Sequence, residues 1–142
     1  MNDSKQMLSS LLRTTQLGQT GIRSVLDTPM RPGLRKALEA QLKEYDSIEG
    51  DAHAIASQRG WELEELEPGV RFFSDMVTRM RLGYGNTDSK IAGMMIQGNT
   101  RGIIDGLKNA HQYNQSDHAI NTLSQRLLDC ENAAIRQMQN FL

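Results

Sequence analysis

Apolar side chains recur at helical spacing through four long stretches of this chain, and this pattern constrains the fold more than any other feature. The stretches are residues 4–26, 32–59, 89–113 and 117–142. Within each, the apolar residues fall every third or fourth position, which places them on one face of an α-helix. Sustained alternation of apolar and polar residues, typical of strands, is absent from the sequence. The pattern therefore predicts an all-α fold of four long helices in a single domain, residues 1–142.

Proline and glycine residues indicate where the helices end. The residue before Pro29 avoids helical dihedral angles, so the first helix is expected to end there, and Pro32 suits the first turn of the second. Gly60 is expected to stop the second helix. Because the first connection is only a few residues long, the first two helices are expected to be antiparallel neighbours. A residue from Thr87 to Ser89 is expected to cap the third helix, and Ser116 or Asp117 the last one.

The connection between the second and third helices is long. It contains a short amphipathic segment at residues 70–82, which predicts an extra helix that caps or crosses the bundle. It begins with Trp61, the only tryptophan of the chain. We interpret this residue as a hydrophobic plug at one end of the bundle, with stacking on a ligand as the alternative.

Three glycines share one face of the third helix. Gly98, Gly102 and Gly106 are four residues apart, so they lie above one another on the helix surface. Each costs about 1 kcal/mol relative to alanine inside a helix, which predicts close packing by another backbone or by a bulky side chain. The opposite face is polar and is interpreted as a solvated stripe, with an anion site as the alternative; it carries Lys90, Gln97, Arg101 and Lys108.

Polar residues also fall on the apolar faces, near the middle of each long helix. They are Gln19, Glu49, Asn99 and Glu131, and Tyr45 lies close to the same level. Four antiparallel helices would bring them together as a hydrogen-bonded layer inside the bundle, because buried carboxyl oxygens need donors. Such a layer fixes helix register without performing chemistry. Glu131 is at the centre of its apolar face, so its pKa is expected to be raised by burial.

A metal site is the alternative interpretation of the same layer. Di-iron bundles use a glutamate from each of two helices and a Glu-x-x-His motif from each of the other two. Glu49 and Glu131 are followed three residues later by Ala52 and Ala134, so both histidines are missing. A single divalent ion held by these two glutamates, with His53 or an added water as a further ligand, is the form that the sequence leaves open.

Other reactive side chains carry no motif. His111 and His118 flank a loop and are expected at the surface, and the single cysteine, Cys130, is expected to be a small apolar residue at a helix edge. One cysteine cannot form an internal disulfide. With a net charge of −1 the chain has no global attraction for nucleic acid or membranes. We expect a cytoplasmic protein, since neither a charged-then-apolar leader nor a long apolar run is present at the start.

The last two long stretches, KIAGMMIQGNTRGIIDGLKNAHQY and LLDCENAAIRQMQNFL, carry a resemblance to a known group of proteins. The chain resembles bacterial proteins of the ferritin-like superfamily, in particular the small four-helix proteins grouped near rubrerythrin-like and spore-coat-F-like domains. The resemblance implies an antiparallel four-helix bundle with a long connection between the second and third helices. Among the family's metal ligands only Glu49 and Glu131 find a counterpart, while Gln19 and Asn99 depart from the pattern.

These observations lead to three functional expectations. The first is a non-catalytic bundle without cofactor that acts as a structural or protein-interaction module, with a homodimer as the commonest assembly. The second is a degenerate metalloprotein that uses Glu49 and Glu131. The third is a small-ligand site in a cavity over the glycines, which close helix packing there would exclude.

Overall fold

The computed structural model describes residues 3–65, 86–113 and 117–142, and within them the protein is entirely helical. The helices are α1 (Asp3–Val25), α2 (Pro32–Arg59), α4 (Thr87–Gln112) and α5 (His118–Gln139). The expected all-α class and the four long helices are confirmed. The short helix expected at residues 70–82 lies outside the described residues.

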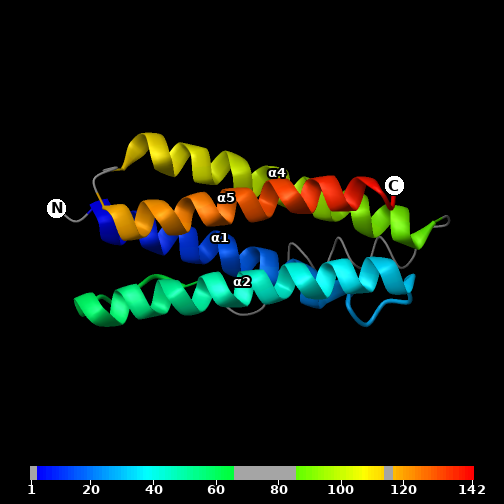
Figure 1. The fold of residues 1–142 in the computed structure, drawn as a ribbon, viewed down its shortest axis with the longest axis horizontal. Coiled ribbons are helices and arrows are strands. Elements are labelled where there is room, and N and C mark those ends of the chain that lie inside the picture. Colours follow the sequence, from blue (N-terminus) through cyan, green and yellow to red (C-terminus); the bar gives the residue numbers. More distant parts are fainter. Residues whose placement is uncertain (1–2, 66–85, 114–116) are drawn as a thin grey trace.

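The four helices form an antiparallel bundle. In Figure 1, α1 and α5 run in one direction and α2 and α4 run in the other. Each of α1 and α5 packs against both α2 and α4, so α1 and α5 lie across one diagonal of the bundle. The expected antiparallel pairing of the first two helices is confirmed. Since α2 ends at the opposite end of the bundle from the start of α4, the connection between them has to join the two ends (Figure 1).

Local signals at the helix ends agree with most of the sequence-based expectations. Pro32 begins α2, and Gly60 ends it in the left-handed conformation with φ of 67°, which glycine adopts without strain. Asp117 caps α5 by accepting a hydrogen bond from the Ile120 amide. The cap of α4 was expected one to three residues too late: Asn86 is the cap, and its side chain accepts from the Ser89 amide.

One hydrophobic core runs along the bundle and draws side chains from all four helices. It includes Leu8, Leu12 and Ile22 of α1, Leu34, Leu38 and Ile48 of α2, Ile91 and Ala92 of α4, and Ile120, Leu123 and Met138 of α5. Burying a side chain of the leucine or isoleucine type stabilises the fold by about 1.5–3 kcal/mol. Trp61 packs against this core from beyond the end of α2, and the Arg59 guanidinium lies over its ring at 5.0 Å. These contacts agree with the plug interpretation.

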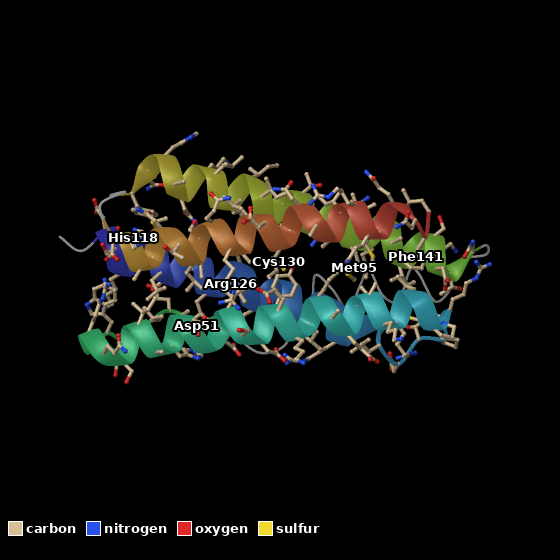
Figure 2. The ribbon with its side chains drawn as sticks, in the orientation of Figure 1. Asp51, Met95, His118, Arg126, Cys130 and Phe141 are labelled. Atoms are coloured by element: carbon tan, nitrogen blue, oxygen red, sulfur yellow. The ribbon has the colours of Figure 1, made fainter. Side chains whose placement is uncertain are left out.

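Ion pairs along the outside tie α5 to α2. Arg126 donates hydrogen bonds to Glu44, Ser47 and Asp51, and Figure 2 shows Arg126 and Asp51 facing one another from the two helices. At the end of the bundle, Arg59 binds the carboxylate of Asp117. None of the helices in the described part of the chain is both long and apolar enough to span a bilayer.

Candidate functional site

Three polar side chains meet inside the bundle, each from a different helix. Tyr45 of α2 donates its hydroxyl hydrogen to Glu131 Oε1 of α5 over 2.9 Å. The Asn99 amide of α4 donates to Glu131 Oε2 over 2.7 Å and to the Tyr45 hydroxyl over 3.2 Å. Tyr45, Asn99 and Glu131 are only 1%, 6% and 2% exposed, so these hydrogen bonds form away from bulk water. We call these three residues the buried triad.

The charge of Glu131 is the main electrostatic feature of the triad. Burial raises the pKa of its carboxyl group from 4.5 to about 7, against the smaller opposing effect of hydrogen bonds from Asn99 and Tyr45. The pKa of Tyr45 is raised well above its ordinary value by burial and then by the Glu131 charge. Glu131 therefore changes its protonation state near neutral pH, while Tyr45 keeps its proton and remains a donor.

Glycines make room for the triad. A Cβ atom added at Gly102 would lie 3.0 Å from the carboxyl carbon and Oε1 of Glu131, so the carboxylate packs directly on the backbone of α4. At Gly18 of α1 a Cβ atom would lie only 2.7 Å from the Tyr45 ring, at Cζ. Both positions are tighter than ordinary van der Waals contact. Glycine is therefore required at Gly18 for the Tyr45 ring to occupy its place, a role that the sequence analysis did not find.

The expected close packing at three glycines holds for two of them. Gly102 accommodates Glu131, and Gly106 accommodates Leu128, whose Cδ2 would lie 2.9 Å from an added Cβ atom. In both cases the neighbour is a side chain, not a backbone. Gly98 is different, because a Cβ atom there would meet nothing within 4 Å in the described part of the chain. Among the described residues the expectation that Gly98 packs closely is therefore wrong, and Gly98 is exposed.

The five-residue polar layer is divided into two groups. Gln19 is buried, but its amide turns toward α2 and donates to Asp46 over 2.8 Å and to Glu49 over 3.3 Å. Glu49 is half-buried and also accepts from Gln16. Glu49 thus faces the α1–α2 edge, whereas Glu131 faces the interior with Tyr45. Helical periodicity places both residues at one level, but the rotation of each helix decides which partners they meet.

The side chains of Glu49, Glu131 and His53 are not arranged to bind one divalent ion, the metal site that the sequence offered as an alternative. Glu49 and Glu131 accept hydrogen bonds from different partners, and His53 is about half exposed and bonded to Glu65. Alanines 52 and 134 stand where the di-iron pattern needs imidazoles. Among the described residues no group of three histidine, cysteine or acidic side chains has the arrangement of a metal site. His111 and His118 are exposed, as expected of surface histidines.

Cys130 directly precedes Glu131 on α5, and its environment is shaped by the same burial and charge. It is partly buried and packs against the core. Burial raises the pKa of its thiol to about 12, with further contributions from the Glu131 and Glu44 charges and an opposing one from Arg126. A thiol with this pKa is almost fully protonated at neutral pH and is a poor nucleophile. The interpretation of Cys130 as a small edge residue is consistent with this environment.

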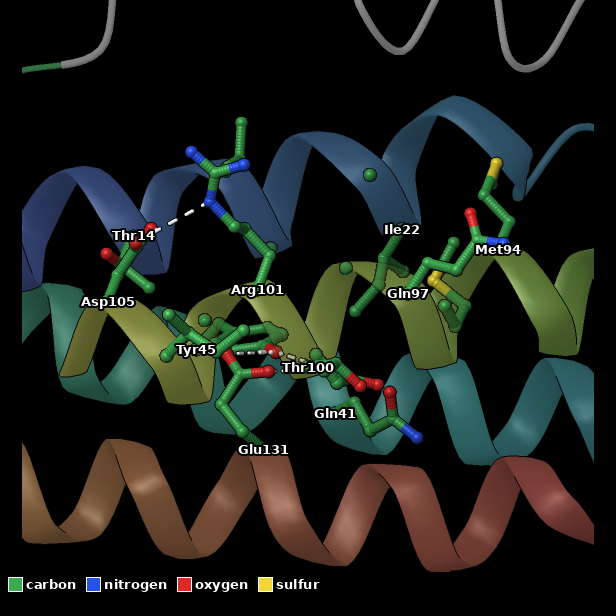
Figure 3. A pocket seen from close by; sticks show the side chains of 18 residues that line it. Thr14, Ile22, Gln41, Tyr45, Met94, Gln97, Thr100, Arg101, Asp105 and Glu131 are labelled. Carbon is green, nitrogen blue, oxygen red and sulfur yellow. Dashed lines mark hydrogen bonds and ion pairs between the residues drawn. The ribbon is translucent and has the colours of Figure 1, made fainter. Parts of the chain in front are cut away.

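A cavity of about 540 Å³ opens beside the triad, mainly between α1 and α4 (Figure 3). Its wall contains all three triad residues, and its apolar surface comes chiefly from Leu17, Ile22, Met94, Met95 and Ile104. Gly18, Gly21, Gly98 and Gly102 line it as well. At the rim Arg101 pairs with Asp105 at 3.5 Å, which Figure 3 shows as a dashed line. A mostly apolar cavity with a few convergent polar groups is the usual form of a small-molecule site.

One buried polar atom of Asn99, a residue that lines the cavity, has no partner among the described residues. The Asn99 amide oxygen, Oδ1, is buried and accepts no hydrogen bond from the described residues. Both hydrogens of the same amide are used by Glu131 and Tyr45. Leaving such an acceptor unsatisfied costs about 1–3 kcal/mol. This atom distinguishes the cavity wall from an ordinary closed core.

Two solved structures match this fold over nearly the whole chain. One is described as a DUF305 fragment from Deinococcus radiodurans; it has a TM-score of 0.76 at 12% identity, over 99% of this chain and 95% of that one. The fold of the present chain is shared with it. The second is a conserved hypothetical protein from Mycobacterium tuberculosis, with a TM-score of 0.76 at 11% identity, over 99% of this chain and 98% of that one. No family model matches the chain, and no curated protein matches it. At these identities the likeness shows the fold alone.

Proposed function

We propose that this protein is a non-catalytic bundle of the ferritin-like type that binds a small molecule in the cavity between α1 and α4. The ferritin-like assignment is supported by the arrangement of the helices, in which one long connection joins opposite ends of the bundle. The binding role is supported by the cavity itself. Its volume of about 540 Å³ falls within the range of about 300–1,000 Å³ that is typical of ligand pockets.

The observation that carries the proposal is the coexistence of open space and an unsatisfied acceptor on one wall. Gly98 lines the cavity at an exposed position where an added Cβ atom would meet nothing within 4 Å among the described residues, and Asn99 next to it keeps Oδ1 without a protein donor among them. A bundle that served only as a scaffold would gain stability by closing this space with larger side chains. A bound molecule would fill the space and supply the missing donor.

The other two expectations receive less support. A metal-binding role would need Glu49 and Glu131 to share one ion, and their different hydrogen-bond partners weigh against that. A protein-interaction or self-association role finds two exposed apolar side chains on one face of α4, Ile104 at 45% and Leu107 at 46%. Two such side chains cover far less than the roughly 800 Å² per partner of a stable interface. Absence of a cofactor, a cytoplasmic location and a homodimer remain predictions.

The test is direct observation of binding with matched cavity variants. We would titrate the full-length protein, labelled with ¹⁵N, with phenylbutanol, phenylbutylamine and phenylbutyrate and follow the amide signals by NMR. Gly18, Gly98 and Gly102 line the cavity, and the amide signals of glycines fall in an uncrowded part of the spectrum. We expect these signals to shift with at least one of the probes.

Two leucine variants provide the control. A side chain at Gly98 meets no neighbour and takes up space in the cavity, so Gly98→Leu should weaken binding by about tenfold or more. A side chain at Gly93 also meets nothing within 4 Å, but Gly93 does not line the cavity, so Gly93→Leu should bind like the parent protein. Equal effects of the two variants, or no shift with any probe, would contradict the proposed function.

A further inference from the structure

The buried triad has surplus acceptors on the cavity wall. Tyr45 has one polar hydrogen, which it donates to Glu131, and the Asn99 amide has two, which go to Glu131 and Tyr45. All the polar hydrogens of the triad are therefore engaged within it when Glu131 is ionised. The Glu131 carboxylate keeps unused lone pairs, and Asn99 Oδ1 has no donor from the described residues. A ligand that reaches this wall can form hydrogen bonds only by donating them.

The same count of hydrogen-bond donors and acceptors explains the orientation of the Asn99 amide. Turning the amide over would place Oδ1 beside the ionised Glu131 carboxylate and remove one of its two donors. The observed orientation keeps both donors on the charge. It leaves the amide oxygen, rather than the amide hydrogens, without a partner.

The charge on Glu131 has no paired cation in the described part of the chain. The titratable groups around it are Tyr45 from α2 and Cys130 on its own helix, and both stay protonated and neutral near pH 7 because their pKa values are raised. From α4 it meets Asn99, which is neutral. The cavity residues of α1 are uncharged; they are Thr14, Leu17, Gly18, Gly21 and Ile22. At the rim Arg101 is already paired with Asp105.

The rest of the cavity is suited to an apolar body. Leu17 and Ile22 of α1 face it from one side and Met94 and Met95 of α4 from another. Methionine side chains adapt their shape to what they contact, because they are unbranched and have three rotatable bonds. The cavity thus combines an apolar space with an anionic, acceptor-rich wall.

We propose that the cavity binds a small organic amine, with its ammonium group at Glu131 and Asn99 and its apolar part against the leucine, isoleucine and methionine side chains. This inference rests on the proposed function, since it assumes that the cavity is a binding site. An ammonium group has three donors and no acceptor, which matches the surplus on the wall. Hydrogen bonds with an ionised donor or acceptor are about twice as strong as neutral ones, and an ammonium group adds an opposite charge to the carboxylate. An alcohol offers one neutral donor, and a carboxylate brings a like charge.

The test compares three probes with the same apolar body. Binding of phenylbutylamine, phenylbutanol and phenylbutyrate to the full-length protein would be measured by isothermal titration calorimetry at pH 8. We expect the amine to bind at least about tenfold more tightly than the alcohol, because its ammonium group brings an opposite charge and three donors to the Glu131 carboxylate, against one donor from the hydroxyl group. The carboxylate is expected to bind more weakly than the alcohol.

The pH profile of the unchanged protein gives a second readout. Glu131 ionises over this range, so the affinity for the amine should rise about tenfold from pH 6 to pH 8, in line with a pKa of about 7. The affinity for the alcohol should change much less, because its hydroxyl group carries no charge and has one hydrogen to donate. Glu131→Gln should remove the preference for the amine over the alcohol and the pH dependence of amine binding. The dependence of amine affinity on pH in the parent protein still tests the inference if the variant folds poorly.

Each outcome decides a different point. If the amine and the alcohol bind equally in the cavity, the amine inference is wrong and the proposed function stands. If none of the three probes shifts the cavity amides, both are wrong. If the preference for the amine persists in Glu131→Gln, the ammonium group binds elsewhere and the inference is wrong. Tighter binding of the carboxylate would also overturn it.

Discussion

Replacing Glu131 by glutamine should change how the stability of this protein depends on pH. The parent carboxyl group is 2% exposed, and burial raises its pKa from 4.5 to about 7. Glutamine has nearly the same shape and never ionises. Its amide oxygen can accept from Tyr45, and Asn99 can turn its own amide over so that Oδ1 accepts from the new amide. We therefore expect Glu131→Gln to fold with the same core.

The sign and magnitude of this pH dependence follow from the difference between the pKa of Glu131 in the folded state and in the unfolded state. Because the folded state holds this proton more tightly than the unfolded state, the parent protein loses stability as the pH rises from about 4.5, and the loss is complete above about 7. A difference between 4.5 and about 7 corresponds to roughly 3 kcal/mol in total. Between pH 5 and pH 8 the expected loss is about 2.5 kcal/mol. The glutamine variant lacks this contribution.

The assay is urea unfolding of both proteins at pH 5 and pH 8. The free energy of unfolding of Glu131→Gln minus that of the parent should rise by about 2.5 kcal/mol between the two pH values, since contributions from all other groups cancel in the difference. Glu39→Gln, which removes an exposed carboxylate of α2, controls for the change in net charge. A change below about 0.5 kcal/mol, or one of the opposite sign, would refute the argument that Glu131 is buried without a cation.

Further predictions concern the neighbours of Glu131. Gly18→Ala should lower the free energy of unfolding by about 1–3 kcal/mol, because its Cβ would lie 2.7 Å from the Tyr45 ring; Gly98→Ala, which meets no neighbour, should raise it by about 0.5–1 kcal/mol. Equal urea midpoints for the two variants would contradict this contrast. Tyr45→Phe removes one donor to Glu131 and should cost about 1–2 kcal/mol and raise the Glu131 pKa further, as carboxyl NMR titration would show; an unchanged or lower pKa would count against the hydrogen bond. Cys130, whose pKa is raised to about 12, should react with iodoacetamide at pH 8 at least about tenfold more slowly in the folded protein than in urea. A fast reaction of the native thiol would show that it is not buried as described.

The helices of this protein could be predicted because their signals are local. Apolar spacing defines the inward face of each helix, and Pro32 and Gly60 define the ends of α2 through the dihedral angles these residues favour. The cap at Asn86 was missed because several residues that can cap stand next to one another there. Which of them accepts the hydrogen bond depends on where the preceding chain approaches the helix.

The site could be predicted only in part. Tyr45, Asn99 and Glu131 could be expected to meet, because each lies near the middle of an apolar face and the helices are antiparallel. Gln19 and Glu49 were expected in the same group, and they belong to the α1–α2 edge. The rotation of each helix about its own axis decides between the two groups. Sequence periodicity does not fix that rotation, because packing of all the side chains determines it.

The cavity was the least predictable feature, since its size depends on how far apart α1 and α4 lie. Glycine patterns usually indicate that two helices approach closely, and a close approach would have left no space. Here the glycines admit side chains: Gly18 admits the ring of Tyr45 and Gly102 admits the carboxylate of Glu131. These two side chains fill the interior beside their own glycines. At Gly98, which is exposed, an added Cβ atom would meet nothing within 4 Å among the described residues.

The energetics of the glycines bear directly on whether the cavity has a role. A glycine inside a helix costs about 1 kcal/mol relative to alanine. At Gly18 and Gly102 the packing of Tyr45 and Glu131 explains that cost, because a methyl group would displace either side chain. At Gly98 the described structure provides no such explanation, since a methyl group would meet nothing within 4 Å and alanine would be the more stable residue. The residue lines the cavity next to Asn99, whose amide oxygen also lacks a partner. A single bound molecule with a donor group and an apolar body would account for both features, which is why the Gly98 variants are the most informative test of the proposed function.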